Sequence, residues 1–341
     1  MKVAIVGVTG VVGETILRVL DERNVAVREL GAFASRDRTE ALRWRERDWP
    51  IRAATPAALA EGGFDAVFFA SSDDASAELA HHAASAGAVV IDNSSTFRLA
   101  AGVPLVVPEV NPHHAGPDDL IFPVANCTAI VLCVGIAPIA RSAGLRSVRV
   151  ATYQAVSGAG KAGLEALASE ERSEFTLEQP GAASPFAAAI FRNVIPLVGS
   201  DLDDAGDSGE EKKVAAETRK MLDLPDLHVA ATTVRVPVRY AHSEAVFLET
   251  ERDTSVAELA RVLEAAPGIA FHRAGIVTPR DVEGQDLVHV ARLRAEGESK
   301  RHFQLWLVGD QVRKGAATNA VQILELLIAR GRFTAPQTVG A

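Results

Sequence analysis

Cysteine is scarce in this sequence: only Cys127 and Cys133 occur among 341 residues, and they lie six positions apart. Both fall in one mostly apolar segment, so a disulfide framework is excluded. Cysteines of this kind are typical of proteins from reducing compartments. The scarcity therefore favours a cytoplasmic protein.

Long apolar runs and basic clusters are also missing. The longest mostly apolar run, 127–140, is shorter than the roughly 20 residues that a membrane-spanning helix needs. The apolar N-terminus resembles a signal peptide only superficially, because Gly7, Gly10 and Gly13 interrupt it. Lys and Arg number 35 against 44 Asp and Glu, which gives a net charge of −9 with no basic run. We therefore expect a protein that binds neither membranes nor nucleic acid.

The composition that remains is that of a globular protein, with 48% hydrophobic and 23% charged residues. Its length fits two domains. Over residues 1–125 apolar strands alternate with amphipathic helices. The expected strands are 2–6, 27–34, 66–70 and 89–92, and the expected helices are 14–23 and 76–86. This alternation predicts an α/β fold, a Rossmann-like doubly wound domain whose parallel sheet is covered on both faces.

The pattern changes at residue 126. A long apolar helix from Thr128 to about Ala140 is followed mainly by strands. These expected strands are 147–156, 227–238, 245–250, 286–294 and 302–308. Residues 126–315 are thus predicted to form an α+β domain with a mixed or antiparallel sheet. An amphipathic helix over 316–330 lies in the C-terminal segment 316–341, which we expect to complete the first domain. The polar stretch 181–209 is expected to be a surface excursion.

A glycine-rich loop joins the first strand to the first helix. Gly7, Gly10 and Gly13 would let the backbone approach a pyrophosphate at a helix N-terminus. A tight turn without a ligand is the alternative. The second strand ends at Ser35 and Arg36, and an arginine there suits the 2′-phosphate of NADP. The alternative for Arg36 is a solvated loop charge.

The two cysteines differ in their surroundings. Cys127 follows the polar Asn126 and precedes the helix that begins at Thr128. A helix N-terminus favours the thiolate, which is the nucleophilic form. Asn126 or backbone N–H groups could donate to an oxyanion. A small buried hydrophobic residue is the alternative, and it suits Cys133, which lies inside the apolar helix.

Taken together, the motifs resemble those of aspartate-semialdehyde dehydrogenase over nearly the whole chain. No single motif is decisive, but they occur in the family's order. They are the 7–13 loop, Asp92-Asn-Ser-Ser-Thr-Phe-Arg98, Val107-Pro-Glu-Val-Asn111, Asn126-Cys-Thr128, Tyr153-Gln-Ala-Val-Ser-Gly158, Asn193-Val-Ile-Pro196, the 210–220 charged segment, Arg235-Val-Pro-Val238 with His242-Ser-Glu244, and Arg313-Lys-Gly-Ala-Ala317 with Asn319.

The resemblance implies a role for each polar residue. Cys127 would be the acyl-thioester nucleophile and His242 the acid/base. The substrate-binding residues would be Gln154, Asn126, Arg235 for the α-carboxylate and Glu210 for the α-ammonium. Arg98 and Lys213 would bind phosphate, although neighbouring Glu211 and Lys212 leave that register open. The cofactor contacts would be Gly7, Thr9, Gly10, Val11, Val12, Ser35, Arg36, Ser157, Gly158 and Asn319. No metal is expected.

The implied reaction is the NADPH-dependent reductive dephosphorylation of L-4-aspartyl phosphate to L-aspartate 4-semialdehyde, on the route to lysine, threonine and methionine. The resemblance also implies a homodimer formed through the second domain, with inorganic phosphate as the other small-molecule partner. The alternatives are an N-acetylglutamyl-phosphate or malonyl-coenzyme A reductase on the same scaffold, or a non-catalytic nucleotide-binding relative. Two departures from the family stand out: the acidic residues of Ala70-Ser-Ser-Asp-Asp74, and Ala241 where the family has glycine.

Overall fold

The chain folds into two compact units in a computed structural model that describes residues 1–176, 184–199 and 202–333. The first unit comprises Met1–Val124 together with the chain from Ala317, and the second comprises Ala125–Ala316. Residues 334–341, the end of the C-terminal segment expected to complete the first domain, lie outside the described residues. So do residues 177–183 and 200–201, in and next to the polar stretch.

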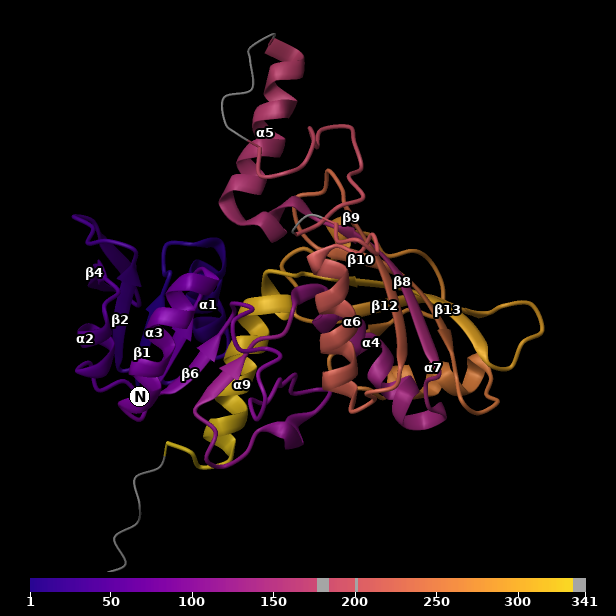
Figure 1. Ribbon diagram of the computed structural model, residues 1–341, viewed down its shortest axis with the longest axis horizontal. Coiled ribbons are helices and arrows are strands. Elements are labelled where there is room, and N and C mark those ends of the chain that lie inside the picture. The colour runs from indigo at the N-terminus through magenta and orange to yellow at the C-terminus, as the bar shows by residue number, and fades with distance from the viewer. Residues whose placement is uncertain (177–183, 200–201, 334–341) are drawn as a thin grey trace, which may run out of the picture. The chain divides into compact units, whose positions relative to one another are not determined.

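The first unit is built on a seven-stranded sheet in the order β3-β4-β2-β1-β5-β6-β7 (Figure 1). Its strands are β1 (Lys2–Val6), β2 (Glu29–Ala34), β3 (Ala41–Trp44), β4 (Arg47–Ala53), β5 (Ala66–Phe69), β6 (Val89–Asp92) and β7 (Ile121–Pro123). Every pairing is parallel except that of β3 with β4. The predicted fold class is therefore confirmed, whereas the hairpin β3–β4 and the short edge strand β7 were not expected.

Helices cover this sheet in two pairs. They are α1 (Val11–Glu22), α2 (Pro56–Ala60), α3 (Asp73–Ser85) and α9 (Thr318–Ala329), and a short helix η1 (Pro112–His114) lies on a connection. Helix α1 packs against α9, while α2 packs against α3. Because all four residues of β5 and of β6 are buried, both faces of the central sheet lie in the core.

The second unit holds a six-stranded mixed sheet in the order β11-β12-β13-β10-β8-β9. Its strands are β8 (Ser147–Gln154), β9 (His228–Arg235), β10 (His242–Glu249), β11 (Ile269–Phe271), β12 (Val288–Ala295) and β13 (His302–Gly309). Its helices are α4 (Cys127–Ala143), η2 (Val156–Ala159), α5 (Gly160–Thr176), α6 (Gly209–Leu222), α7 (Val256–Glu264), α8 (Pro279–Val282) and the π-turn η3 (Arg313–Ala317). The apolar helix α4 contacts α6, α7, β12 and β13 and is the centre of the core.

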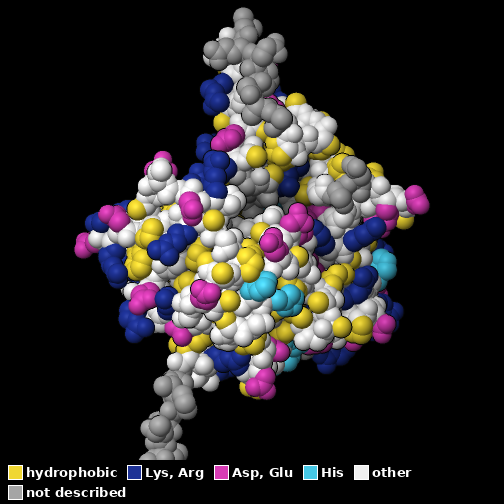
Figure 2. Space-filling model, turned by 60° about the vertical axis from the view of Figure 1, so that its left-hand side comes forward, with side chains coloured by type: hydrophobic (Ala, Val, Ile, Leu, Met, Phe, Trp, Pro, Cys, Tyr) yellow, Lys and Arg dark blue, Asp and Glu magenta, His cyan; other side chains and the backbone are white. Residues whose placement is uncertain are grey.

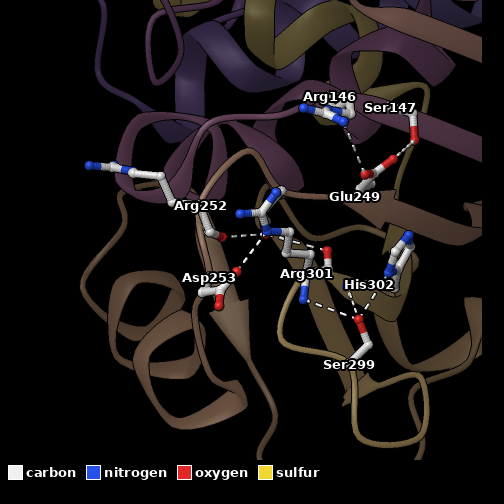
Figure 3. A network of polar contacts seen from close by, with 9 residues as sticks. Arg146, Ser147, Glu249, Arg252, Asp253, Ser299, Arg301 and His302 are labelled. Atoms are coloured by element: carbon white, nitrogen blue, oxygen red, sulfur yellow. Dashed lines mark hydrogen bonds and ion pairs between the residues drawn. The ribbon is translucent and has the colours of Figure 1, made fainter.

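A polar network lies at the C-terminal end of β10 (Figure 3). Arg301 Nε donates to Asp253 Oδ1 at 2.6 Å, and Ser299 Oγ lies 2.9 Å from His302 Nδ1. These groups are largely exposed, so solvent screens the ion pair and it adds little to the stability of the fold. Strand β10 begins at His242, so this network lies at the opposite end of the strand from that histidine.

The surface carries charges of both signs. On the face shown in Figure 2, Lys and Arg side chains are interspersed with Asp and Glu. Among residues 1–176, 184–199 and 202–333, no helix is both long and apolar enough to cross a bilayer.

Candidate active site

Cys127 is the first residue of α4, as its position after Asn126 predicted. Asn126 is the N-cap: its Oδ1 accepts hydrogen bonds from the N–H groups of Thr128 at 3.0 Å and Ala129 at 3.1 Å. The positive end of the helix dipole therefore lies at Cys127 and favours its thiolate. Cys133 is fully buried six residues further along α4, and burial raises the pKa of its thiol. Only Cys127 is placed to react.

His242 lies opposite Cys127, with its Nε2 3.6 Å from the Sγ atom. The backbone N–H of Ala155 donates to His242 Nδ1 at 3.0 Å. A backbone N–H can only donate, so Nδ1 carries no proton and the proton of the neutral ring is on Nε2. Burial, followed by the charge of Arg235, holds the pKa of His242 well below its usual value. The imidazole thus faces the sulfur as a neutral N–H donor.

Arg235 ends strand β9 and is buried, with 7% of its surface exposed. Its Nη1 donates to the carbonyl of Ala155 at 2.6 Å. Burial lowers its pKa, while the nearby Cys127 and Glu210 raise it. A guanidinium has five N–H donors, so after the bond to Ala155 it retains the donors needed to bind a carboxylate in two-pronged fashion.

Two amides converge on the carboxylate of Glu210. Gln154 Nε2 donates to Glu210 Oε1 at 3.0 Å, and Asn126 Nδ2 donates to the same oxygen at 2.9 Å. Gln154 Nε2 also lies 2.9 Å from Thr128 Oγ1, on the first turn of α4. Although Glu210 lies in a charged segment, only 8% of its surface is exposed. It belongs to the site.

The charged start of α6 separates into different roles. Glu211 forms a capping box with Ser208 and accepts from the N–H of Thr233 at 2.8 Å. Lys212 pairs with Asp203. The side chains of Glu211 and Lys212 therefore have partners outside the site. Glu210 faces Asn126 and Gln154, and Lys213 is half-buried on the same helix.

Gly158 lies against the reacting side chains. A Cβ added there would come 2.8 Å from Arg235 Nη1 and 3.4 Å from His242 Cε1. We expect Gly158→Ala to lower kcat/KM by about tenfold to a hundredfold, since a displacement of about 1 Å at a reacting group can cost a factor of ~10². Steady-state kinetics beside a melting curve measures this. Unchanged kinetics would show that the guanidinium has room to move.

The glycine loop of the first unit has the form that a dinucleotide requires. Gly7 has a φ of +86°, and a Cβ there would lie 2.2 Å from the carbonyl oxygen of Ala70. A Cβ on Gly13 would lie 2.3 Å from the carbonyl oxygen of Gly7. Gly10, the N-cap residue of α1, makes no side-chain cap bond, and an uncapped helix N-terminus such as that before Val11 and Val12 favours an anion. The loop fits a pyrophosphate.

The segment after β2 agrees with this. Ser35 and Arg36 are exposed. Asp37 does not face the same way: its Oδ1 accepts from the N–H of Ala53 at 2.8 Å and ties the loop to β4. The carboxylate closest to the position that selects NAD is therefore engaged in the fold, while Arg36 is exposed directly after β2.

The remaining predicted contacts lie in both units. Asn319 is buried in the first unit, where its Nδ2 donates to the carbonyl of Val106 at 3.1 Å. Arg98, also in the first unit, donates from Nη2 to the carbonyl of Asn93 at 2.8 Å. Ser157 is buried in the second unit, and its hydroxyl accepts a hydrogen bond from Gln311.

The acidic departure from the family has a structural reason. Asp73 begins α3, and its carboxylate accepts from the Ser95 N–H at 2.8 Å and from the Ser95 hydroxyl at 2.6 Å. It therefore holds the loop after β6 that leads to Arg98. Ala241, the other departure, adopts a φ of +66°, the left-handed region in which glycine costs nothing.

Three buried residues near the site were given no role from sequence. Gln311 accepts from the Ala241 N–H at 2.9 Å and also donates to Ser157. Glu217 accepts from the N–H of Asn126 at 2.5 Å. Glu244 is fully buried on β10, and burial raises its pKa well above the usual value. Only Glu217 had a usable signal: it lies two helical turns after Glu210.

A glycine-rich dinucleotide loop in one unit, with a Cys–His pair beside a buried arginine in the other, defines a cysteine-dependent dehydrogenase. The family model described as "Semialdehyde dehydrogenase, NAD binding domain" matches residues 2–116, and the one described as "Semialdehyde dehydrogenase, dimerisation domain" matches residues 136–314. The chain belongs to the aspartate-semialdehyde dehydrogenase family, which confirms the resemblance inferred from its motifs.

Individual relatives support this over nearly full length. The aspartate-semialdehyde dehydrogenase of Aquifex aeolicus is 40% identical over 337 residues, which cover 97% of this chain and 98% of the relative. Aspartate-semialdehyde dehydrogenase 2 of Vibrio cholerae is 41% identical over 331 residues, with coverages of 96% and 97%. The crystal structure of aspartate semialdehyde dehydrogenase II from Vibrio cholerae matches with a TM-score of 0.91 at 38% identity, covering 96% of this chain and 98% of that one, and a second structure of it is complexed with ASA.

Proposed function

We propose that this enzyme reduces L-4-aspartyl phosphate to L-aspartate 4-semialdehyde with NADPH, releasing inorganic phosphate. The observation that carries the proposal is the pairing of Cys127 with His242 at 3.6 Å, beside the buried Arg235 and Glu210. The pairing supplies a nucleophile and a proton donor. Arg235 and Glu210 supply opposite charges for an α-carboxylate and an α-ammonium.

The residues of the site suggest the steps. The Cys127 thiolate attacks the acyl carbon of the substrate, and the carbon–oxygen bond to phosphate breaks. When bound, the nicotinamide supplies hydride to the resulting thioester. The tetrahedral oxyanion then collapses to the aldehyde and expels the Cys127 thiolate. The Nε2–H of His242 faces first the oxyanion and then the expelled thiolate. It stabilises each negative charge by donating a hydrogen bond.

Glu210 favours this substrate over its two nearest rivals. The bonds from Asn126 and Gln154 use its Oε1, so Oε2 is the oxygen that would meet a free ammonium. N-acetylglutamyl phosphate has an uncharged amide in place of the ammonium, and malonyl-coenzyme A has no nitrogen there. Either rival would leave a buried carboxylate without its cation, which is costly.

The overall proposal is tested in the reverse direction. The protein is mixed with aspartate semialdehyde, phosphate and NADP, and formation of the reduced cofactor is followed by absorbance. We expect reduction that requires all three. Activity with N-acetylglutamate semialdehyde but none with aspartate semialdehyde would show that the proposed substrate is wrong. No activity with any semialdehyde would favour a non-catalytic nucleotide-binding relative.

NADP is proposed as the cofactor because of Arg36. A hydrogen bond to a charged group is worth about 1.5–3 kcal/mol, so Arg36→Ala should weaken NADP binding roughly tenfold or more and leave NAD nearly unchanged. Arg38→Ala, an exposed change two residues along, is the matched control. Titration calorimetry with both cofactors measures the difference. Equal affinity of the parent protein for NADP and NAD would contradict the proposal.

Arg98 and Lys213 are proposed to bind the phosphoryl group. At the start of α6, Lys212 is paired with Asp203, so Lys213 is the cation of that helix start for the task.

A cytoplasmic homodimer is proposed as well. Tyr153 on β8 and Phe247 on β10 point to the face of the mixed sheet away from α4 and are 38% and 39% exposed. Covering such aromatics is typical of an interface, and sedimentation should give twice the chain mass.

A further inference from the structure

Helix α6 presents a second carboxylate to the start of α4, besides Glu210. Glu217 lies seven residues after Glu210, two turns along the same face of the helix. Only 1% of its surface is exposed. Its Oε2 accepts the backbone N–H of Asn126 at 2.5 Å. Val214, between the two acids on that face, is fully buried, so this side of α6 lies inside the unit.

Asn126 is consequently held at three points. Glu217 accepts from its backbone N–H, its Oδ1 caps α4, and its Nδ2 donates to Glu210. The next residue is the nucleophile. On another side, the backbone of Gly315 passes so close that a Cβ added there would lie 2.9 Å from Cys127 Cβ. The peptide that leads into Cys127 is therefore hydrogen-bonded by Glu217 and closely packed against Gly315.

A carboxylate is an expensive acceptor for this purpose. An amide oxygen or a hydroxyl could also accept a backbone N–H, whereas burying a carboxylate costs free energy unless its partners compensate. Its advantage is that bonds to charged acceptors are shorter and stronger than neutral ones. The feature it fixes is the direction of Cys127 Sγ, which must meet both His242 Nε2 and an acyl carbon.

We propose that Glu217 is a positioning residue for the nucleophile. By accepting the Asn126 N–H it holds the Asn126–Cys127 peptide so that Sγ points at His242 and the substrate. It touches neither substrate nor cofactor. The proposal rests on the proposed function only in the identity of the acyl group that Cys127 attacks. The orientation of the thiolate is a property of the protein alone.

The test uses the full chain in a Cys133→Ala background, so that Cys127 is the only thiol. Glu217→Met removes the acceptor at similar volume, and Glu217→Gln keeps an acceptor without charge. Thr218→Val is the matched control, an equally buried isosteric change one residue along α6. Because misplacing a reacting group by about 1 Å can cost a factor of ~10², we expect Glu217→Met to lower kcat about 30- to 100-fold with KM for the semialdehyde within about threefold.

Glu217→Gln should retain kcat within about fivefold of the background, because the amide oxygen replaces the acceptor. The second readout needs neither substrate nor cofactor: the rate constant for alkylation of Cys127 by iodoacetamide across a pH series. Glu217→Met should slow alkylation at every pH above the thiol pKa, while Glu217→Gln and Thr218→Val should not.

Three outcomes would overturn the proposal. Glu217→Met could keep kcat and alkylation within threefold of the background. Glu217→Gln could lose as much as Glu217→Met, which would assign the effect to charge. The loss could also track a reduced folded fraction by circular dichroism, with Thr218→Val equally affected. If the parent protein shows no semialdehyde activity, the proposed function fails, while the alkylation comparison still decides the role of Glu217.

Discussion

Cys127→Ala should abolish turnover while leaving the fold intact. In the proposed mechanism the thiolate forms the covalent bond on which every later step depends, and no other described residue near His242 can replace it. Loss of a covalent nucleophile typically removes several powers of ten in kcat. Steady-state assays at high protein concentration, beside a melting curve, measure the loss. The expected result is activity below detection with an unchanged melting temperature.

Cys133→Ala is the control for that variant. The side chain is fully buried in α4, and burial raises the pKa of its thiol, so it is a poor nucleophile. Its replacement should leave substantial activity and cost a modest amount of stability through lost packing. Iodoacetamide should therefore modify Cys127 in the native protein and spare Cys133. Near-normal turnover by Cys127→Ala would contradict the thioester route entirely.

Arg235→Ala should be the next most damaging change. Two hydrogen bonds to a substrate carboxylate, at about 1.5–3 kcal/mol each, correspond to roughly 10²- to 10⁴-fold in kcat/KM for the semialdehyde. The guanidinium also donates to the carbonyl of Ala155, whose N–H fixes the tautomer of His242, so kcat should fall as well as KM rise. Arg235→Lys should rescue little, because an ammonium cannot reproduce the planar fork.

Lys213→Ala and Arg98→Ala supply the contrast. If Lys213 and Arg98 bind the phosphoryl group, each substitution should raise the KM for phosphate far more than the KM for the semialdehyde. Arg235→Ala should raise the KM for the semialdehyde far more than the KM for phosphate. Varying the two substrates separately makes the comparison. An equal loss for both substrates, accompanied by a lower melting temperature, would instead assign Arg98 to holding its own unit together.

Much of the site followed from the sequence because its signals are local. Cys127 could be assigned to a helix start because a polar Asn126 precedes a long apolar run, and the glycine loop because it interrupts the first apolar segment. Both features depend on a few adjacent residues. The roles of His242 and Arg235 depended on the family resemblance, since a single histidine or arginine on a strand carries no local signal.

What the sequence did not predict depends on contacts between distant segments or on unusual turns. Hairpin β3–β4 turns at Arg45 and Glu46, with φ values of 49° and 60°, where glycine or asparagine normally marks such a turn. Gln311 acts 70 residues away on Ala241, and Asp73 acts 22 residues away on Ser95. No periodicity records such pairs.

The seven-residue spacing of Glu210 and Glu217 restricts how this chain can change in length. One residue inserted between them would rotate everything beyond it by about 100°, turning one of the two carboxylates away from α4. Insertions before Ser208, where the capping box begins the helix, would leave both in register. Variation in length among descendants of this gene should therefore collect in the polar stretch ahead of α6, with none inside its first two turns.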